Sequence, residues 1–510
     1  MSIAKCYSAH LVGLSIEIIT VEVDISNGLN AVSIVGLGDR AVEEAKDRVS
    51  AAIKNCGFVS PKQKNQKVVI SLAPAHVRKE GPAFDLAIAI SYLVAAGEIN
   101  SETENILFLG ELSLEGRIRH VPGILPLLCQ AKKQGFNKVF VPKDNADEAS
   151  LATDIVIYAV ETLSQTISIL TNKISIDPLK GIELATEEST KIAEKDMCMI
   201  RGNETVKRGL EIAAAGAHNI LMFGPPGTGK TMLAQSFSSL LPPLTHEEAV
   251  EVTGIHSAAH ILTNGFIKYP PFRAPHHTAS YPAIVGGGAF PQPGEITLAH
   301  RGVLFLDEFP EFDRSVLEAL RQPLEERSIT ISRARGSITF PAQCILIASM
   351  NPCPCGKPRN HGCLCKQGII AAYRRRVSGP IMDRLDIWVN VNKIDYEKLA
   401  SKNVLTESSA VIKSRVVTAR NIQAQRFKKF GINKKFNSEM SAGDIEKCIV
   451  MNDSTRNFLK ETGQKLLLSG RAFHRVIKVA QTIVDLASEN EVRQKHILEA
   501  IQYRQKMDGP

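Results

Sequence analysis

The run GPPGTGKT occupies residues 224–231 and decides how the chain around it folds. Its spacing matches GxxxxGK[ST], in which backbone N–H groups surround phosphate oxygens, the lysine adds a positive charge and the hydroxyl contacts Mg²⁺. The apolar residues 220–223 predict a strand before this loop, and residues 232–241 predict a helix after it. The N-terminus of that helix then faces the phosphates. The motif predicts a site for ATP and Mg²⁺.

Two further strands are predicted to bring polar side chains to this site. The run VLFLDE at residues 303–308 is a buried strand that ends in two acids. We expect Asp307 to organise Mg²⁺ and Glu308 to orient the water that attacks the γ-phosphate. A second apolar strand ends at Asn351, whose amide is placed to contact the γ-phosphate or that water. The predicted nucleotide-binding residues are Gly224, Pro225, Pro226, Gly227, Thr228, Gly229, Lys230, Thr231 and Asp307, with Thr231 and Asp307 as magnesium ligands.

The bulk composition is that of a globular protein with several domains. The chain has 510 residues, of which 44% are hydrophobic, so two to four domains with their own cores are expected. Its apolar runs are shorter than the roughly 18 residues that span a bilayer, which favours a soluble, cytoplasmic protein without a membrane partner. The net charge of +8 is a modest basic excess and hints at a polyanionic partner.

The sequence pattern divides the chain into four segments. Residues 1–170 alternate β-rich runs with helical patterns and predict an α/β or α+β domain. Residues 171–196 are polar and suit a linker. Residues 197–395 carry the nucleotide motifs and predict a parallel sheet, and residues 396–510 predict a helical lid. In the first segment the expected strands are 16–23, 31–35, 67–72 and 138–141, and the expected helices are 41–55 and 84–96.

Four of the ten cysteines crowd into a short stretch of the predicted ATPase core. They form a CxC pair, seven residues and a second CxC pair, with proline and glycine around them. Four thiolates at tetrahedral reach suit Zn²⁺, and such a site is structural because it leaves no ligand position for water. Zinc is favoured over reduced free thiols and over a redox or iron–sulfur role. The predicted zinc ligands are Cys353, Cys355, Cys363 and Cys365.

Several longer motifs resemble the magnesium-chelatase-like branch of the AAA+ superfamily, and within it the competence-associated ComM/YifB proteins. These motifs are FRAPHHTAS (272–280), PGEITLAHRGVLFLDEFPEF (293–312), MNPCPCG (350–356) and SGPIMDRLDI (378–387). The resemblance covers nearly the whole chain. It implies an AAA+ core with an insertion in its second helix, followed by a helical lid.

The resemblance also implies roles for single residues. Asn351 corresponds to sensor 1, and Arg384 to the arginine finger that reaches the γ-phosphate bound by a neighbouring subunit. Such a finger requires an oligomer, and the family architecture implies a hexameric ring. Arg471 corresponds to sensor 2 on the lid, with Arg475 as the alternative. Without a neighbour, Arg384 would form only a surface ion pair.

The first segment resembles the proteolytic domain of Lon. The run RKEGPAFDLAIAI (78–90) contains the glycine–proline step that precedes the nucleophilic serine in Lon, but Ala83 stands at the serine position. Leu125 stands where Lon has the activating lysine. Without a nucleophile and a base, peptide hydrolysis should be absent. A similar domain in RadA helps to build a ring around DNA, and this analogy of fold implies a role in assembly and DNA contact.

Basic residues provide candidate DNA contacts. Arg333 and Arg335 lie between two β-like runs, which predicts a hairpin with a basic tip, and related ring helicases project such a hairpin into the pore. Residues 411–436 contain eight lysines or arginines and no acid. That run is as compatible with a solvated helical face as with a phosphate footprint. His276 and His277 are interpreted as loop or pore contacts rather than metal ligands.

These features lead to one principal hypothesis and two alternatives. The first is an ATP-driven hexameric DNA translocase or helicase, whose family role is branch migration in homologous recombination and natural transformation. Its partners would be single-stranded or branched DNA, copies of itself and a candidate recombinase. A chelatase-type chaperone that remodels a protein or assists metal insertion is the alternative from another class. An ATP-dependent protease is disfavoured by Ala83 and Leu125.

Overall fold

The chain folds into two compact units, and each is described by itself. The first contains Met1–Thr186 and Thr245–Lys268, and the second contains Glu187–Leu244 and Tyr269–Pro510. The segment 245–268 lies in the sequence between two parts of the second unit, but it packs in the first unit. The computed structural model describes residues 3–79, 81–184, 195–263, 265–288, 291–333, 336–357, 362–393 and 406–504.

A seven-stranded mixed sheet forms the centre of the first unit. Its strand order is β3-β4-β2-β1-β5-β8-β9. The β1–β2 and β2–β4 pairs are antiparallel, and the remaining pairs are parallel. The strands are β1 (Ala4–Val12), β2 (Ser15–Asn27), β3 (Ala31–Val35), β4 (Gln66–Ala73), β5 (Ile106–Phe108), β8 (Lys138–Pro142) and β9 (Val156–Val160), with a small hairpin of β6 (Glu111–Leu112) and β7 (Ile118–Arg119).

Helices cover both faces of this sheet, because successive strand residues alternate between two apolar clusters. Leu107 and Val139 join one cluster, whereas Phe108 and Phe140 join the other. The predicted strands and helices of this segment are confirmed, with their ends shifted by a few residues. The helices are α1 (Arg40–Asn55), α2 (Asp85–Ala95), α3 (Ile124–Ala131), η1 (Lys132–Gln134), η2 (Lys143–Asn145), α4 (Ala146–Ala149), α5 (Leu163–Leu170) and α8 (His246–Ala258).

Helix α8 belongs to this unit through packing against α3. The backbone N–H of Gly123 donates to Ser257 Oγ at 2.8 Å. Val250 of α8 and Phe266 after it pack on the apolar cluster that contains Leu125. The helix starts with a capping box in which Thr245 and Glu248 bond to each other's backbone N–H groups. The segment between the two nucleotide motifs thus contributes a helix to the N-terminal unit.

The second unit is built on a five-stranded parallel sheet, as the spacing of its motifs predicts. The strand order is β11-β14-β17-β10-β18. A second hairpin, β15–β16, precedes β17 and confirms the hairpin predicted there. The strands are β10 (Ile220–Phe223), β11 (Phe272–Arg273), β14 (Val303–Leu306), β17 (Ile345–Met350) and β18 (Ile387–Asn390), with the hairpins β12 (Gly286–Gly287) to β13 (Gln292–Pro293) and β15 (Ser328–Arg333) to β16 (Gly336–Pro341).

Short helices connect these strands. The β12–β13 hairpin lies between two of these helices, α9 and α10. Helix α9 leads into β12 and α10 follows β13, which matches the expected insertion within a helical segment. The helices of the core are η3 (Met197–Met199), α6 (Glu204–Gly216), α7 (Lys230–Phe237), η4 (Ser238–Leu240), α9 (Tyr281–Val285), α10 (Glu295–Leu298), η5 (Phe309–Glu311), α11 (Arg314–Ala319), α12 (Arg321–Glu326), α13 (Gln367–Arg375) and α14 (Gly379–Met382).

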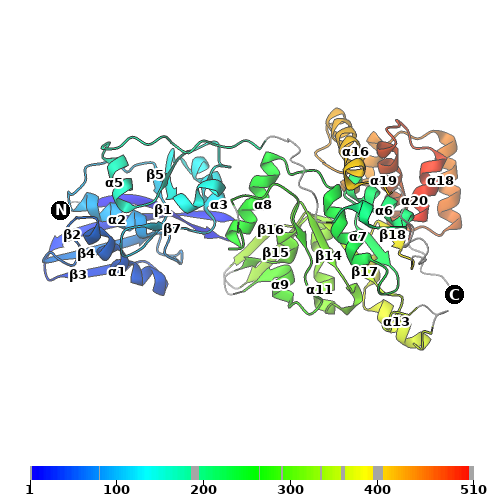
Figure 1. Ribbon diagram of the computed structural model, residues 1–510, viewed down its shortest axis with the longest axis horizontal. Helices are drawn as coiled ribbons and strands as arrows, with labels where there is room; N and C mark the ends of the chain where they lie inside the picture. The colour runs from blue at the N-terminus through cyan, green and yellow to red at the C-terminus, as the bar shows by residue number, and fades with distance from the viewer. Residues whose placement is uncertain are drawn as a thin grey trace. The chain divides into compact units, whose positions relative to one another are not determined.

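The C-terminal part of the second unit is helical, as predicted. Figure 1 shows α16, α18, α19 and α20 grouped together in orange and red. Their apolar sides join one continuous cluster with α6, α7 and the parallel sheet. The elements are α16 (Ser409–Lys429), η7 (Asn437–Glu439), α17 (Ala442–Cys448), α18 (Asp453–Lys465), α19 (Gly470–Leu486) and α20 (Gln494–Gln502).

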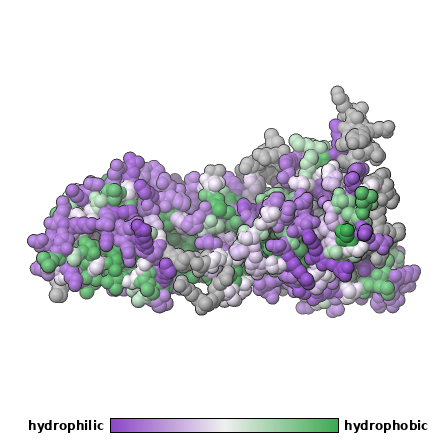
Figure 2. Space-filling model, turned by 90° about the horizontal axis from the view of Figure 1, so that it is seen from below, coloured by the Kyte–Doolittle hydropathy of each residue, from purple (hydrophilic) through white to green (hydrophobic). Residues whose placement is uncertain are grey.

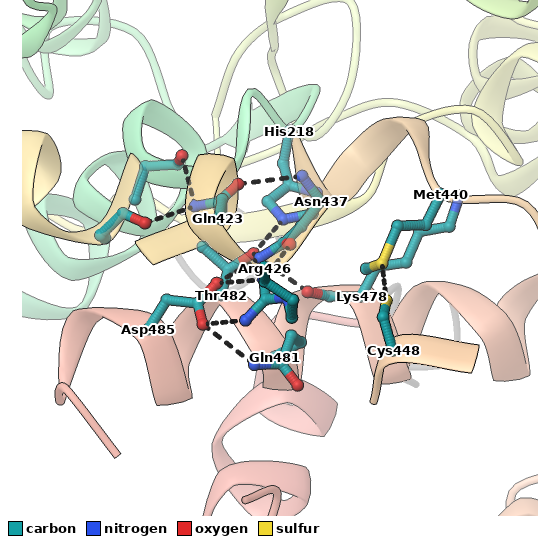
Figure 3. Close-up of polar contacts among 12 residues, drawn as sticks. His218, Gln423, Arg426, Asn437, Met440, Cys448, Lys478, Gln481, Thr482 and Asp485 are labelled. Atoms are coloured by element: carbon teal, nitrogen blue, oxygen red, sulfur yellow. Dashed lines mark hydrogen bonds and ion pairs between the residues drawn. The ribbon is translucent and has the colours of Figure 1, made fainter. Parts of the chain in front are cut away.

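A buried polar network ties this helical part to the core of its unit (Figure 3). Arg426 of α16 forms a bidentate pair with Asp485 of α19, at 2.6 and 2.8 Å. Asn437 donates to Asp485 and to Thr482, and Thr482 Oγ1 lies 2.8 Å from His218 Nε2. His218 follows α6 and therefore belongs to the core. Arg426 Nε is buried without a hydrogen-bond partner, but the other bonds of the network connect α16 and α19 to the residue that follows α6.

The surface carries scattered rather than continuous apolar residues. Figure 2 shows hydrophilic side chains over much of the displayed face, with smaller hydrophobic patches between them. The most exposed large apolar side chains, Leu29, Leu364 and Leu467, come from separate loops. Within the described ranges, every helix is too short or too polar to cross a lipid bilayer.

The Arg426–Asp485 pair generates a stability prediction. The Asp485 side chain is fully buried, so Asp485→Ala leaves the Arg426 guanidinium buried without its carboxylate. We expect a loss of about 3 kcal/mol or more in unfolding free energy of the second unit. Trp388, the single tryptophan, lies in β18 and reports this unit by fluorescence during denaturation. Lys495→Ala, which breaks an exposed pair with Glu489, is the control and should change it by less than about 1 kcal/mol. Equal effects of both variants would contradict the prediction.

Candidate ATPase site

The loop GPPGTGKT lies between β10 and α7, as its sequence predicts. Gly227 and Gly229 have φ angles of 73° and 86°, a left-handed conformation that favours glycine. Gly224 is required for a different reason. A Cβ at this position would lie 2.2 Å from the carbonyl oxygen of Val391, which follows β18. The loop is thus shaped by its own backbone and by the end of a neighbouring strand.

The Lys230 ammonium is surrounded by oxygen atoms. Its Nζ donates to the carbonyl oxygens of Gly224 and Pro225, at 2.7 and 2.9 Å, and to Asn351 Oδ1 at 3.0 Å. Burial lowers the pKa of Lys230, while the negative charges of Asp307 and Glu308 act in the opposite direction. The predicted neighbourhood of Lys230 and Asn351 is therefore present, because parallel strands β10 and β17 end at the same edge. Phosphate oxygens suit a cation held in this way.

Asp307 directly follows β14, and its carboxylate contacts the hydroxyl groups of Thr231 and Ser349. Its Oδ2 accepts a hydrogen bond from Thr231 Oγ1 at 2.9 Å, and its Oδ1 accepts one from Ser349 Oγ in β17. A hydroxyl and a carboxylate at this distance are the oxygen donors that Mg²⁺ takes from a protein when phosphates complete its shell. The two predicted magnesium ligands therefore fit that ion.

Glu308 follows Asp307 in a left-handed conformation with φ of 51°. Its side chain is half-exposed, and its Oε2 lies 3.1 Å from Nδ1 of His277. His276 does not share this contact, since its Nδ1 bonds to Thr278 Oγ1 at 2.8 Å. The two adjacent histidines, for which the sequence predicts the same role, therefore have different partners.

Arg384, the predicted arginine finger, and Arg471, the predicted sensor 2 residue, meet at one carboxylate. Arg384 Nη2 forms an ion pair with Glu325 of α12, and Arg471 Nη2 lies 3.8 Å from the same Oε1. These arginines lower the pKa of Glu325, with Arg384 as the main cause. Arg384 is largely buried, whereas the Arg471 side chain is 67% exposed. Among the described contacts, both guanidinium groups bond away from the loop 224–231.

Arg475, the alternative sensor residue, has other partners. Its Nη1 donates to the carbonyl oxygen of Leu385 at 2.9 Å, and its Nη2 lies 3.4 Å from Asp383 Oδ1. It therefore ties α19 to the loop before β18 and is mostly buried. Of the two candidates, Arg471 is the side chain that the described structure leaves accessible to a ligand.

The four predicted zinc ligands lie together. Their Sγ atoms all fall within 4.8 Å of one another, and the Cys353–Cys355 and Cys353–Cys363 distances are 3.2 and 3.5 Å. Tetrahedral Zn²⁺ with bonds of about 2.3 Å requires sulfur–sulfur distances near 3.8 Å, so the cluster fits that ion. The backbone N–H of Lys357 lowers the pKa of Cys355 to about 6, whereas burial raises the pKa of Cys353 to about 12.

The cysteine loop also touches the nucleotide loop. Gly356 approaches Pro226 so closely that a Cβ at Gly356 would lie 2.8 Å from Pro226 Cδ. Gly356 itself has a φ angle of 72°. The cluster therefore supports the loop 224–231 as well as the segment between Asn351 and Arg384.

The predicted DNA-contact residues are only partly within the described chain. Arg333 is the last residue of β15 and pairs with Gly336 across the hairpin, while Arg335 lies outside the described residues. In the basic run 411–436, Arg415 pairs with Glu211 and Glu407, and Arg426 pairs with Asp485. These arginines are engaged in folding contacts of the helical part.

Three family models match successive parts of the chain. Residues 21–145 match subunit ChlI of Mg-chelatase, residues 196–399 match magnesium chelatase subunit ChlI, and residues 406–504 match the C-terminal part of that subunit. The competence protein ComM of Haemophilus influenzae is 42% identical over 510 residues, which cover 99% of this chain and 98% of that protein. The chain belongs to the ComM/YifB family.

One further relative matches nearly the whole chain, and another matches a short part of it. The uncharacterized protein YifB of Escherichia coli is 40% identical over 507 residues, covering 99% of this chain and 97% of YifB. The DNA repair protein RadA of Listeria monocytogenes is 36% identical over 94 residues, 18% of this chain and 20% of RadA.

Sequence reasoning missed three residues of the site. Ser349 holds Asp307, His277 contacts Glu308, and Glu325 holds Arg384. Ser349 had a local signal, since it is a polar residue within an otherwise apolar strand. His277 was noticed as a histidine but without its partner, because the contact joins loops that follow different strands. Glu325 is one of many acids on short helices and carries no local signal.

The cysteine cluster predicts a bound metal that affects nucleotide binding. We expect the purified, reduced protein to contain about one zinc per chain by elemental analysis, and Cys353→Ser with Cys363→Ser to remove it. Because the cysteine loop supports Pro226, this variant should also bind ATP more weakly in a titration. Cys198→Ser is the matched control, since Cys198 is an exposed cysteine outside the cluster. A reduced and folded protein without metal would contradict the prediction.

Proposed function

We propose that this protein hydrolyses ATP at the site around Lys230 and uses the energy to move DNA. The observation that carries the first part is the convergence of Lys230, Asn351, Thr231 and Asp307 at one edge of the parallel sheet. Ligands of parallel α/β sheets bind at this edge. Membership of the magnesium-chelatase-like AAA+ group supports the same conclusion.

Each side chain has a separate task in the proposed reaction. Lys230 exchanges its carbonyl acceptors for phosphate oxygens, and Asn351 orients the γ-phosphate or the attacking water. Glu308 orients that water and accepts its proton. Mg²⁺, held by Thr231 and Asp307, would neutralise charge on the phosphate oxygens. The reaction also requires positively charged side chains near the leaving phosphates, and among the described contacts of this half-site Lys230 is such a cation.

Arg384 and Arg471 are proposed to supply that charge to a neighbouring subunit. Both arginines gather at Glu325, where they neutralise one carboxylate with two positive charges. The surplus positive charge suits a bound nucleotide, and the exposure of Arg471 makes it available to one. A ring, most simply a hexamer, would place this patch against the next subunit's nucleotide, so that every site is completed by two chains.

DNA is proposed as the substrate because of the hairpin and the relatives. A basic hairpin tip with Arg333 and Arg335 would contact phosphates without reading sequence, which is what a translocating motor needs. One relative is named a competence protein and another a DNA repair protein. We therefore propose branch migration during homologous recombination, with single-stranded or branched DNA and a recombinase as partners.

The N-terminal unit is proposed to serve assembly and DNA contact rather than proteolysis. Ala83 and Leu125, at the positions expected for a Lon-type nucleophile and base, pack in one apolar cluster. Neither side chain can act in acyl transfer. The chelatase-type chaperone remains the second candidate because the family models are described as magnesium chelatase subunits. Porphyrin-dependent ATP hydrolysis would favour it.

The central experiment measures ATP hydrolysis and the movement of a labelled branched DNA. The protein should hydrolyse ATP faster with DNA and move the branch only with ATP.

Lys230→Ala should lose nucleotide binding, whereas Glu308→Gln should bind ATP and lose at least about 100-fold in turnover. Arg333→Ala with Arg335→Ala should keep basal hydrolysis and lose DNA stimulation, with Arg493→Ala, an exposed arginine of the helical part, as control. An active ATPase that neither responds to DNA nor moves a branch would refute the proposal.

Mixing two inactive variants tests whether Arg384 acts on a neighbour. Arg384→Ala should bind ATP without turnover, and Lys230→Ala should retain an intact arginine without binding ATP. In mixed rings, a Lys230→Ala subunit can complete the site of an Arg384→Ala neighbour, so hydrolysis should reappear on mixing. Co-assembly is checked by pull-down of differently tagged chains. Mixed rings that stay inactive, or an Arg384→Ala protein with normal turnover, would contradict the interface role.

A further inference from the structure

The contact between His277 and Glu308 has a geometry that suits control of the general base. Nδ1 of the imidazole lies 3.1 Å from Oε2 of the carboxylate. A proton on Nδ1 makes the ring the donor, whichever charge it carries. The contact uses one carboxylate oxygen and leaves Oε1 of Glu308 for a water molecule.

The His277 imidazole is less exposed than the Glu308 carboxylate that it contacts, and it packs against two other rings. The His277 side chain is 28% exposed and that of Glu308 is 50% exposed. The His277 ring lies 4.2 Å from the His276 ring, tilted by 32°, and meets Phe312 edge-on at 6.5 Å, with both distances measured between ring centroids. A half-exposed glutamate samples several rotamers unless a fixed partner selects one. His277 is such a partner.

The position of His277 in the chain links this contact to the rest of the unit. His277 lies in the loop between β11 and α9. At the far end of α9, the Ile331 side chain of β15 lies close to Gly286, where an added Cβ would be 2.9 Å from Ile331 Cδ1. One short helix therefore separates the hairpin that carries Arg333 from the loop that holds Glu308.

We propose that His277 is a positioning residue for ATP hydrolysis, which holds the Glu308 carboxylate in the orientation that activates water. The inference rests on the proposed role of Glu308 as general base. His277 touches neither the nucleotide nor the water and acts through Glu308. Its removal therefore lowers turnover while ATP binding stays intact, since the residues that grip the nucleotide are elsewhere.

The side-chain chemistry permits a test within one residue. In His277→Asn, the amide nitrogen occupies nearly the place of Nδ1 and still donates to Glu308. In His277→Gln, the longer side chain carries its amide nearer to the place of Nε2, away from the carboxylate. His277→Ala removes the donor altogether. His276→Ala is the control, because His276 is the adjacent histidine but is exposed and bonds to Thr278 instead of Glu308.

We expect kcat for ATP hydrolysis to fall roughly tenfold or more in His277→Ala and His277→Gln, with KM changed by less than about threefold. His277→Asn should recover most of the loss, and His276→Ala should stay within about threefold of the wild type. Steady-state kinetics, ATP titration and thermal melting of each variant measure these quantities. A melting temperature equal to that of the wild type excludes a general loss of structure.

The opposing outcomes are distinct. Wild-type turnover in His277→Ala, or equal losses in the Asn and Gln variants, would overturn the positioning role. Parallel losses in His276→Ala would assign the effect to the packing of the loop instead. Glu308→Gln separates this inference from the proposed function: if it turns over normally, the role of Glu308 fails. If Glu308→Gln is inactive while His277→Ala is normal, only the positioning role fails.

Discussion

A buried ammonium that must be surrounded by oxygen atoms organises the second unit. Lys230 Nζ bonds to two carbonyls of its own loop and to Asn351 at the end of β17. Moving a lysine out of water is costly unless acceptors replace the water, so the loop and the strand must stay close. Gly224 makes this possible, since its missing side chain admits the backbone of Val391. The contacts of Lys230 thus connect the loop 224–231 to the end of β17 and shape the nucleotide site.

The acidic residues next to Lys230 divide into two roles through their surroundings. Asp307 accepts hydrogen bonds from hydroxyl groups on both sides, those of Thr231 and Ser349, which orient its carboxylate. Glu308 is half-exposed and contacts the imidazole of His277. Hydroxyl donors therefore orient the proposed magnesium ligand, and an imidazole orients the proposed base.

The two arginines that are proposed to complete a neighbouring site contact Glu325 rather than the nucleotide loop. Glu325 holds Arg384 and lies near Arg471, so two cations share one carboxylate on the same chain. Such an arrangement keeps Arg384 ordered without a neighbour, and it leaves net positive charge for a second ligand. The cysteine loop, which packs on Pro226, lies in the sequence between Asn351 and Arg384. A metal in that cluster would stiffen the segment between Asn351 and Arg384.

Local patterns in the sequence determined the strands and helices of the first segment, the loop 224–231, the hairpin before β17 and the cysteine cluster. Each of these depends on residues close together in the chain, where backbone geometry, periodicity and spacing are sufficient. The tertiary structure alone decided that α8 packs with the N-terminal unit, that His277 rather than His276 contacts Glu308, and that Arg384 and Arg471 share Glu325. These contacts join residues on different elements, and nothing in the local sequence of one partner specifies the other. Their specificity comes from the direction in which each side chain leaves its helix or loop, which only the packed fold determines.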